Sequence, residues 1–290
     1  MLVKVLIENT TLDPALQAAH GLSLYVESGG QRLLVDAGPS GQTLENAAAL
    51  SVDISSVSYL FLSHGHYDHT GGVTAFAKAV PGARIYVRSN AFGDFYHGDR
   101  DIGMDKAIAG LPGLTKIYGN TIITSDISLL TRFTGRVHFP VGNKGLTVRQ
   151  ADGTAVDDDF SHEMCVVVRE NGRFALFSGC AHNGILNIMT KFREVYGLSP
   201  NAVFSGFHMK KDGAYTKEEV EVIEDTARRL NEAYSGTVFY TGHCTGEAAY
   251  ALMKPILGDQ LQRLSTGLSL RLFEEEERFR PGTLEDLEQI

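Results

Sequence analysis

The stretch His64-Gly65-His66-Tyr67-Asp68-His69 decides how this sequence is interpreted. It follows residues 57–62, which have the apolar composition of a strand, and precedes residues 73–80, which have a helical pattern. Two imidazoles at a spacing of two can bind one cation together, while the adjacent carboxylate and imidazole turn towards a second cation nearby. The motif therefore predicts a site at which two metal ions share and activate a water molecule.

Strands and helices alternate on both sides of this motif. The turn Ser28-Gly29-Gly30-Gln31 predicts an antiparallel hairpin between residues 22–27 and 32–36, and a second hairpin is expected between residues 164–169 and 173–178. Each hairpin precedes a series of β/α units, so the fold class is α/β, with mixed sheets flanked by helices and two similar halves. The other expected strands cover residues 2–8, 84–88, 202–205, 237–241 and 264–272, and the other expected helices cover residues 43–50, 184–196, 217–233 and 246–254.

The chain is expected to form a single domain over residues 1–290. Residues 90–159 lose the alternation, and no linker composition brackets them. They are interpreted either as loops and hairpins over the substrate side of the site or as a meander that completes the sheet. The acidic segment from Glu274 onward is expected to be a solvated surface tail.

Composition excludes several classes of protein. A net charge of -9 without a basic stripe argues against a nucleic-acid partner, and no apolar run is long enough for a membrane span or a signal peptide. Three cysteines in 290 residues do not make a disulfide framework and suit a reducing cytoplasm. We therefore expect a cytoplasmic protein with a small-molecule substrate.

Further candidate ligands lie at other predicted strand ends. His162 precedes one strand of the second hairpin, Cys180 follows the other strand, and His243 follows residues 237–241. The ends of strands in such sheets are the usual position of active sites. Each of these residues alone could be structural, but together they supply the ligand types that the motif by itself lacks.

The motif, together with Val35-Asp36-Ala37-Gly38 before it and Thr70-Gly71-Gly72 after it, resembles the metal-binding signature of the metallo-β-lactamase fold superfamily. That resemblance implies a four-layer αβ/βα sandwich over the whole chain. Residues 177–185, 205–208 and 241–246 are similar to a narrower family of metal-dependent hydrolases, related to the dihydropterin-ribofuranosylaminobenzene phosphate synthase of methanopterin biosynthesis.

The resemblance implies a ligand set and several supporting residues. It assigns His64, His66 and His162 to the first metal and Asp68, His69 and His243 to the second, and it makes Asp36 a residue that orients a ligand by hydrogen bonding. Most superfamily hydrolases have a bridging Asp where this chain has Cys180, which is expected to bind or border the second metal. His182 is the alternative to His162 in the first shell; otherwise His182, like His208, is a candidate proton donor or substrate contact, and Asp68 also counts as catalytic.

Four functions are compatible with these residues. The first is a binuclear metal-dependent hydrolase whose metal-bound hydroxide attacks a small phosphoester, ester or lactone. The second is a pterin-arylamine transferase that displaces diphosphate, with Lys210, Lys211 or His208 assisting. The third is an iron-dependent dioxygenase of the same fold, and the fourth is a non-catalytic ligand sensor. The expected cofactors are two divalent metal ions, with zinc favoured and manganese or iron as alternatives.

Overall fold

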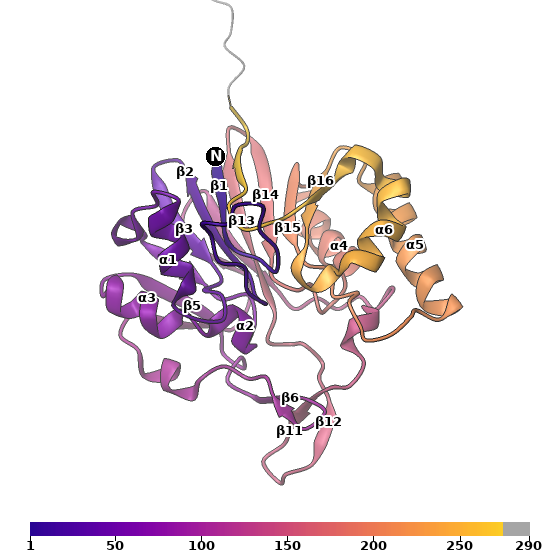
Figure 1. The fold of residues 1–290 in the computed structure, drawn as a ribbon, viewed down its shortest axis with the longest axis horizontal. Coiled ribbons are helices and arrows are strands. Elements are labelled where there is room, and N and C mark those ends of the chain that lie inside the picture. Colours follow the sequence, from indigo (N-terminus) through magenta and orange to yellow (C-terminus); the bar gives the residue numbers. More distant parts are fainter. Residues whose placement is uncertain (275–290) are drawn as a thin grey trace, which may run out of the picture.

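Two seven-stranded sheets form the centre of the protein, and the computed structural model describes residues 1–274 (Figure 1). The first sheet has the strand order β18-β1-β2-β3-β4-β5-β8. The predicted hairpin of β2 and β3 is confirmed, and β3, β4, β5 and β8 run parallel. The strands are β1 (Leu2–Ile7), β2 (Ser23–Ser28), β3 (Gln31–Val35), β4 (Tyr59–Phe61), β5 (Arg84–Arg88), β8 (Leu114–Ile117) and β18 (Ser269–Arg271).

The second sheet repeats this plan, in the order β17-β16-β15-β14-β13-β10-β9. An antiparallel hairpin of β13 and β14 is followed by parallel strands β15, β16 and β17. Both halves of the chain thus consist of a hairpin followed by parallel β/α units, as the sequence predicts. The strands are β9 (Thr121–Ile122), β10 (Ile127–Thr131), β13 (Met164–Glu170), β14 (Arg173–Ser178), β15 (Ala202–Ser205), β16 (Val238–Thr241) and β17 (Leu261–Arg263).

Helices cover the outer face of each sheet, and an apolar core fills the space between the sheets. Val26 and Phe61 of the first sheet share this inner core with Val166 and Phe204 of the second. Helices α1 (Gln42–Ala49) and α3 (Val73–Ala79) pack on the first sheet, and α4 (Ile185–Tyr196), α5 (Lys217–Ala233) and α6 (Glu247–Leu257) pack on the second. The expected four-layer α/β sandwich is confirmed (Figure 1). One-turn elements are α2 (Tyr67–Thr70), η1 (Ile54–Ser56), η2 (Lys106–Gly110), η3 (Val141–Asn143), η4 (His243–Thr245) and η5 (Gly258–Gln260).

The segment of residues 90–159 divides between the two expected arrangements. Strands β8, β9 and β10 extend the edges of the two main sheets, as a meander would. Strands β6 (Asp94–His97), β7 (Arg100–Asp101), β11 (Leu146–Arg149) and β12 (Ala155–Asp157) instead form a separate four-stranded sheet, which projects from the body of the molecule (Figure 1). This small sheet is tied to the histidine motif, because Tyr67 donates a backbone hydrogen bond to Ile102 and Met104 donates one to Gly65.

The prediction of one β run over residues 264–272 is wrong. The chain leaves the second sheet after β17, crosses to the first sheet and pairs there as β18 with β1. Within the crossing, Thr266 donates its hydroxyl to the backbone oxygen of Glu8, and Gly267 and Leu268 exchange backbone hydrogen bonds with Val5 of β1, so contacts with the first sheet fix the crossing. The predicted surface tail lies, apart from Glu274, outside the described residues. No helix within residues 1–274 is long and apolar enough to cross a membrane.

Candidate metal centre

The candidate ligands gather where the parallel strands of both sheets end. His64, His66, Asp68 and His69 follow β4, Cys180 and His182 follow β14, and His243 follows β16. All seven side chains belong to buried residues. The carboxyl ends of parallel strands share one edge of a sheet, which explains why residues so distant in the sequence meet.

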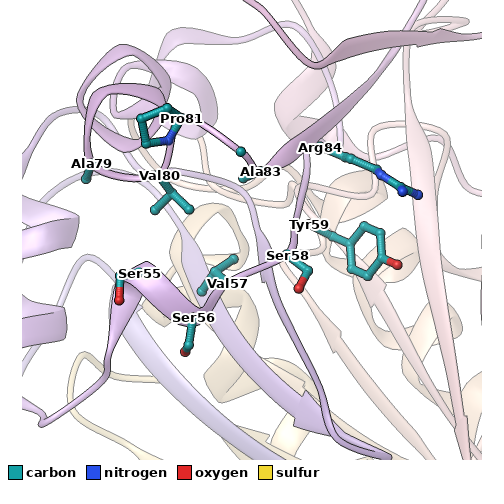
Figure 2. A pocket seen from close by; sticks show the side chains of 11 residues that line it. Ser55, Ser56, Val57, Ser58, Tyr59, Ala79, Val80, Pro81, Ala83 and Arg84 are labelled. Atoms are coloured by element: carbon teal, nitrogen blue, oxygen red, sulfur yellow. The ribbon is translucent and has the colours of Figure 1, made fainter.

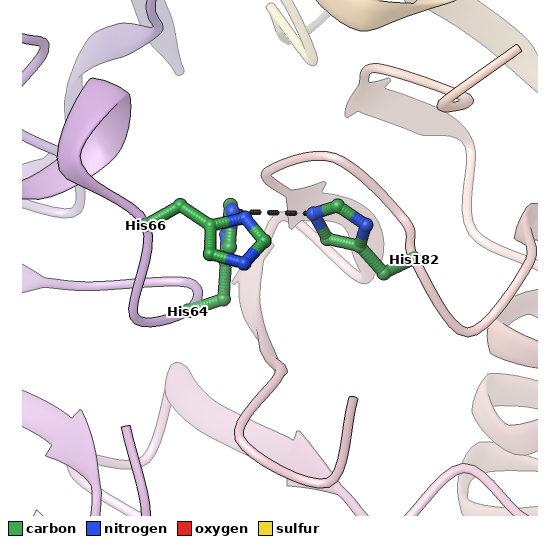
Figure 3. A group of neighbouring side chains, drawn as sticks. All are labelled: His64, His66 and His182. Carbon is green, nitrogen blue, oxygen red and sulfur yellow. Dashed lines mark hydrogen bonds between the residues drawn. The ribbon is translucent and has the colours of Figure 1, made fainter. Parts of the chain in front are cut away.

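The first group consists of His64, His66 and His182. One ring nitrogen from each lies within 4.8 Å of the others, and Nε2 of His64 is 3.3 Å from Nε2 of His182. Figure 3 shows the first two rings approaching from the loop after β4 and the ring of His182 approaching from the opposite side. The structure thus places His182, the alternative to His162 in the sequence analysis, beside the two histidines of the motif.

The hydrogen bonds of His64 and His182 fix their tautomers. The hydroxyl of Ser63 donates to Asp36, so its oxygen accepts from Nδ1 of His64 at 2.8 Å. The amide nitrogen of Asn143 donates to the backbone oxygen of His182, so the amide oxygen is the atom that accepts from Nδ1 of His182, at 3.0 Å. Both rings therefore carry their proton on Nδ1, and two unprotonated Nε2 atoms face each other.

His162 has the opposite arrangement. Its Nδ1 accepts a hydrogen bond from the backbone N–H of Gly65 at 3.1 Å, so its Nε2 carries the proton and donates it to Asp158 at 3.0 Å. Both ring nitrogens are occupied within the protein, although the ring lies near His64 and His66, with centroid distances of 6.0 and 5.4 Å. The geometry thus favours His182 over His162, which sequence order had favoured, as the third ligand of the first group.

The second group consists of Asp68, His69, Cys180 and His243. Nε2 of His69 lies 3.1 Å from Sγ of Cys180 and 3.1 Å from Nε2 of His243, which in turn lies 3.2 Å from Oδ2 of Asp68. His64 has a ring nitrogen within 4.8 Å of the ligand atoms of His69 and Cys180, so the two groups adjoin. These separations are close to those between neighbouring ligands of one tetrahedral zinc ion.

Asp36 and Asn9 orient the histidines of the second group. Asp36 is fully buried and accepts from Nδ1 of His69 at 2.6 Å, as well as from the backbone and hydroxyl of Ser63. The amide oxygen of Asn9 accepts from Nδ1 of His243 at 2.8 Å. Both rings thereby direct Nε2 inward, and the expected orienting role of Asp36 agrees with these contacts.

The donor set fits divalent cations. Nε2 of His66 is buried and has no hydrogen-bond partner among residues 1–274, and a buried polar atom without a partner is costly. The opposed unprotonated Nε2 atoms of His64 and His182 repel each other unless a positive charge lies between them. Imidazole, thiolate and carboxylate are also the ligand types that zinc prefers.

Electrostatics keep the first group uncharged. Burial, assisted by neighbouring imidazoles, lowers the pKa of His64 and His182 well below the usual value and lowers that of His66 to about 3. Burial also lowers the pKa of His69, but the carboxylates of Asp36 and Asp68 outweigh it and raise the value to about 9. Burial raises the pKa of the Cys180 thiol, so this group is neutral unless a cation lies beside it.

Sequence reasoning missed three residues of the site. Asn9 and Asn143, which fix the tautomers of His243 and His182, lie in segments without a motif. His20 is half exposed but has its Nε2 only 3.4 Å from Oδ2 of Asp68. An isolated Asn or His carries no periodicity or spacing signal, so only tertiary contacts identify these residues.

His208 borders the first group. Its ring centroid is 4.1 Å from that of His182, and its Nδ1 is buried without a partner among the described residues. Its φ of 48° is one of several left-handed values around the centre, with 62° at Asp36 and 48° at His243, and such strain is frequent in functional sites. Of the two lysines considered for an anion, Lys211 pairs with Glu219, while Lys210 lines a cavity of about 210 Å³ beside His243.

A cavity of about 580 Å³ lies away from this centre, between residues 55–59 and 79–84 (Figure 2). These residues lead into β4 and β5, so the cavity lies at the opposite strand edge from His64. Among residues 1–274, Arg84 is the only charged residue that lines it, and none of the candidate ligands does so. We therefore assign no function to this cavity.

Comparisons with known proteins agree with this geometry. The family model of the metallo-beta-lactamase superfamily matches residues 17–212. An uncharacterised protein of Methanocaldococcus jannaschii is 28% identical over 84% of this chain and 91% of its own. From the same organism, 7,8-dihydropterin-6-methyl-4-(beta-D-ribofuranosyl)-aminobenzene-5'-phosphate synthase is 26% identical over 86% of this chain and 88% of its own.

Solved structures share the fold. Tm1679, described as a metal-dependent hydrolase of the beta-lactamase superfamily, superimposes with a TM-score of 0.79 and 29% identity, covering 94% of this chain and 100% of that protein. Zinc-bound PqqB from Methylobacterium extorquens has a TM-score of 0.54 and 11% identity, with coverage of 94% and 100%. The second likeness extends to the fold alone.

Proposed function

This chain belongs to the metallo-beta-lactamase superfamily, and we propose that it is a metal-dependent hydrolase of small phosphoesters, esters or lactones. One observation carries the proposal: the unprotonated Nε2 atoms of His64 and His182 face each other beside the unpartnered Nε2 of His66, and the Nε2 atoms of His69 and His243 face each other in the adjoining group. The likeness to Tm1679, a metal-dependent hydrolase, supports it over most of the chain.

Two divalent cations would be held by residues of this chain, and zinc is the favoured metal. We assign His64, His66 and His182 to the first, and Asp68, His69, Cys180 and His243 to the second. The combination of imidazole with a cysteine favours zinc over magnesium or calcium, which prefer oxygen ligands. When bound, such cations supply Lewis acidity and activate water at neutral pH.

The surrounding residues position the reacting groups. Asp36, Asn9 and Asn143 hold three ligand rings in one tautomer, so the ligand nitrogens need no rearrangement before a cation binds. We propose that His208, whose ring lies beside that of His182, contacts the substrate at the first group.

The proposal is tested by elemental analysis of protein purified without added metal, coupled to a screen of chromogenic phosphomonoesters, phosphodiesters and lactones. We expect bound zinc and turnover of at least one substrate class, with both lost together on chelation. Metal-free protein with undiminished turnover would contradict the proposal.

A second candidate function is pterin-arylamine transfer with displacement of diphosphate. It is favoured by the 26% identity to the methanopterin-related synthase over most of both chains. Formation of a pterin-arylamine adduct from the corresponding diphosphate and amine, detected by mass spectrometry, would establish this function. The absence of an adduct with protein that hydrolyses a phosphoester would exclude it.

A further inference from the structure

Three arginines line a cavity of about 360 Å³ near the metal centre, and none of them has a carboxylate partner. Arg88 lies at the end of β5, while Arg132 and Arg136 lie in the segment after β10. Within residues 1–274 none of the three forms an ion pair, although the exposed carboxylate of Asp159 also lines the cavity. Three positive charges therefore line one cavity that contains two carboxylates, so the lining has a net positive charge.

Arg88 is the most unusual of the three. It is only 7% exposed, and its guanidinium donates to the backbone oxygens of Ile117 (2.7 Å) and Ser161 (3.3 Å). These contacts leave N–H donors of the five-donor guanidinium unused. A buried charge is normally paired, and here burial and the positive charge of Arg132 together lower the pKa of Arg88. The protein thus keeps the buried charge of Arg88 near the exposed like charge of Arg132.

Arg132 adds a second observation. Its backbone has a φ of 60°, a left-handed conformation that residues with a side chain rarely adopt. One guanidinium nitrogen donates to the backbone oxygen of Tyr118 at 3.1 Å, and the rest of this exposed side chain is free for a ligand. Backbone strain of this kind costs free energy and is concentrated at ligand-binding positions.

The second carboxylate of the cavity does not neutralise the arginines. Glu163 is buried and accepts hydrogen bonds from the backbone N–H groups of His182 and Asn183 and from the side-chain amide of Asn183. Its oxygens are therefore occupied on the side of the metal centre. The ring of Phe160, which also lines the cavity, stacks on His182 with a centroid distance of 4.7 Å. The cavity is thus separate from the first group but shares its supporting residues.

We propose that this cavity, the arginine pocket, is a binding site for a phosphate group. A guanidinium matches the oxygens of phosphate with two parallel hydrogen bonds, and the net positive charge of the lining favours a dianion over a monoanion. The site contains none of the residues assigned to the metals. The proposal therefore goes beyond the proposed hydrolase function and does not depend on it. The phosphate is either that of a small phosphorylated molecule or the free ion.

The experiment measures binding of inorganic phosphate, and of ribose 5-phosphate as a phosphomonoester, to the purified full-length protein by isothermal titration calorimetry. Arg132→Gln and Arg136→Gln, both at exposed positions, should each weaken binding about tenfold or more, since each removes a charge-assisted hydrogen bond. Arg132→Lys should weaken it less. Arg173→Gln, a matched loss of charge at an exposed position of β14, should leave the affinity unchanged.

His66→Ala distinguishes the pocket from the metal centre, where phosphate could also bind. Arginine-dependent phosphate binding should persist in this variant even if hydrolase activity is lost, so failure of one proposal is separable from failure of the other. Binding of both ligands identifies the phosphomonoester as the recognised group, whereas binding of inorganic phosphate alone identifies the free ion. Arginine variants that fold normally by circular dichroism and bind phosphate like the wild type would overturn the proposal, as would loss of all binding in His66→Ala.

Discussion

The turns that carry His162 and His182 lie on either side of the hairpin β13–β14 and place two buried imidazoles near the same pair of motif histidines. The ring centroid of His182 is 4.8 Å from that of His64, and that of His162 is 6.0 Å away. The difference in distance is small, but the hydrogen bonds are opposite: Asn143 accepts from Nδ1 of His182, whereas Gly65 donates to Nδ1 of His162. Whether Nδ1 donates or accepts its hydrogen bond determines whether Nε2 is free to bind a cation. This hydrogen bond, more than the distance from His64, decides which ring can be a ligand.

Removal of His66, which lies near both His162 and His182, should have the largest effect on turnover. His66→Ala deletes an unpartnered Nε2 and should reduce turnover about 1000-fold or more, because bound cations contribute several kcal/mol to stabilising the transition state. The measurement is kcat/KM together with metal content. His97→Ala, a change at an exposed histidine of the small sheet, is the control, and undiminished turnover in His66→Ala would be incompatible with the proposed centre.

In the second group, Asp36 has the role that Asn143 has for His182, because it accepts from Nδ1 of His69. Asp36→Asn should weaken the second cation about 10- to 100-fold, since an amide cannot accept from Nδ1 of His69 and from both donors of Ser63 as a carboxylate does. Competition with a chromogenic chelator gives the affinity. An unchanged affinity in a correctly folded variant would show that the tautomer of His69 does not depend on Asp36.

Asn143→Ala tests the His182 side directly. Loss of the acceptor for Nδ1 should weaken the first cation about tenfold, at the lower end of the usual range because the partner is a neutral amide. Asn120→Ala, which removes an amide that bonds Thr131 at the edge of the second sheet, is a matched control. If both variants bind metal with equal affinity, Asn143 has no role in orienting His182.

Asp158→Asn tests the His162 side, and its effect should be on stability rather than on metal. Asp158 accepts one hydrogen bond from Nε2 of His162 and another from the backbone N–H of Phe160, and the variant loses one of these two bonds. We expect destabilisation by about 1–3 kcal/mol in urea unfolding, with metal content unchanged. Asp159→Asn, at an exposed position, should change stability by less than about 0.5 kcal/mol. A loss of bound metal in Asp158→Asn would indicate that His162 is a metal ligand.

The sequence predicted the fold and one side of the site for identifiable reasons. The hairpins, the parallel strands and the loop of residues 64–69 rest on local signals, namely a turn between apolar strands and ligand types at fixed spacing. The final strand was mispredicted because no local signal in residues 264–272 marks a change of sheet, which depends on contacts with Val5 and Glu8, more than 250 positions away. His162 and His182 could not be separated for a similar reason, since their tautomers depend on Asp158 and Asn143.

The central claim is most directly tested by counting zinc in His182→Gln and His162→Gln, both purified without added metal and compared with the wild type. We predict about two zinc ions per chain in the wild type and in His162→Gln, and about one in His182→Gln. The reverse result, with zinc lost from His162→Gln and retained by His182→Gln, would contradict the claim that the hydrogen-bond partner of the remote nitrogen selects the ligand.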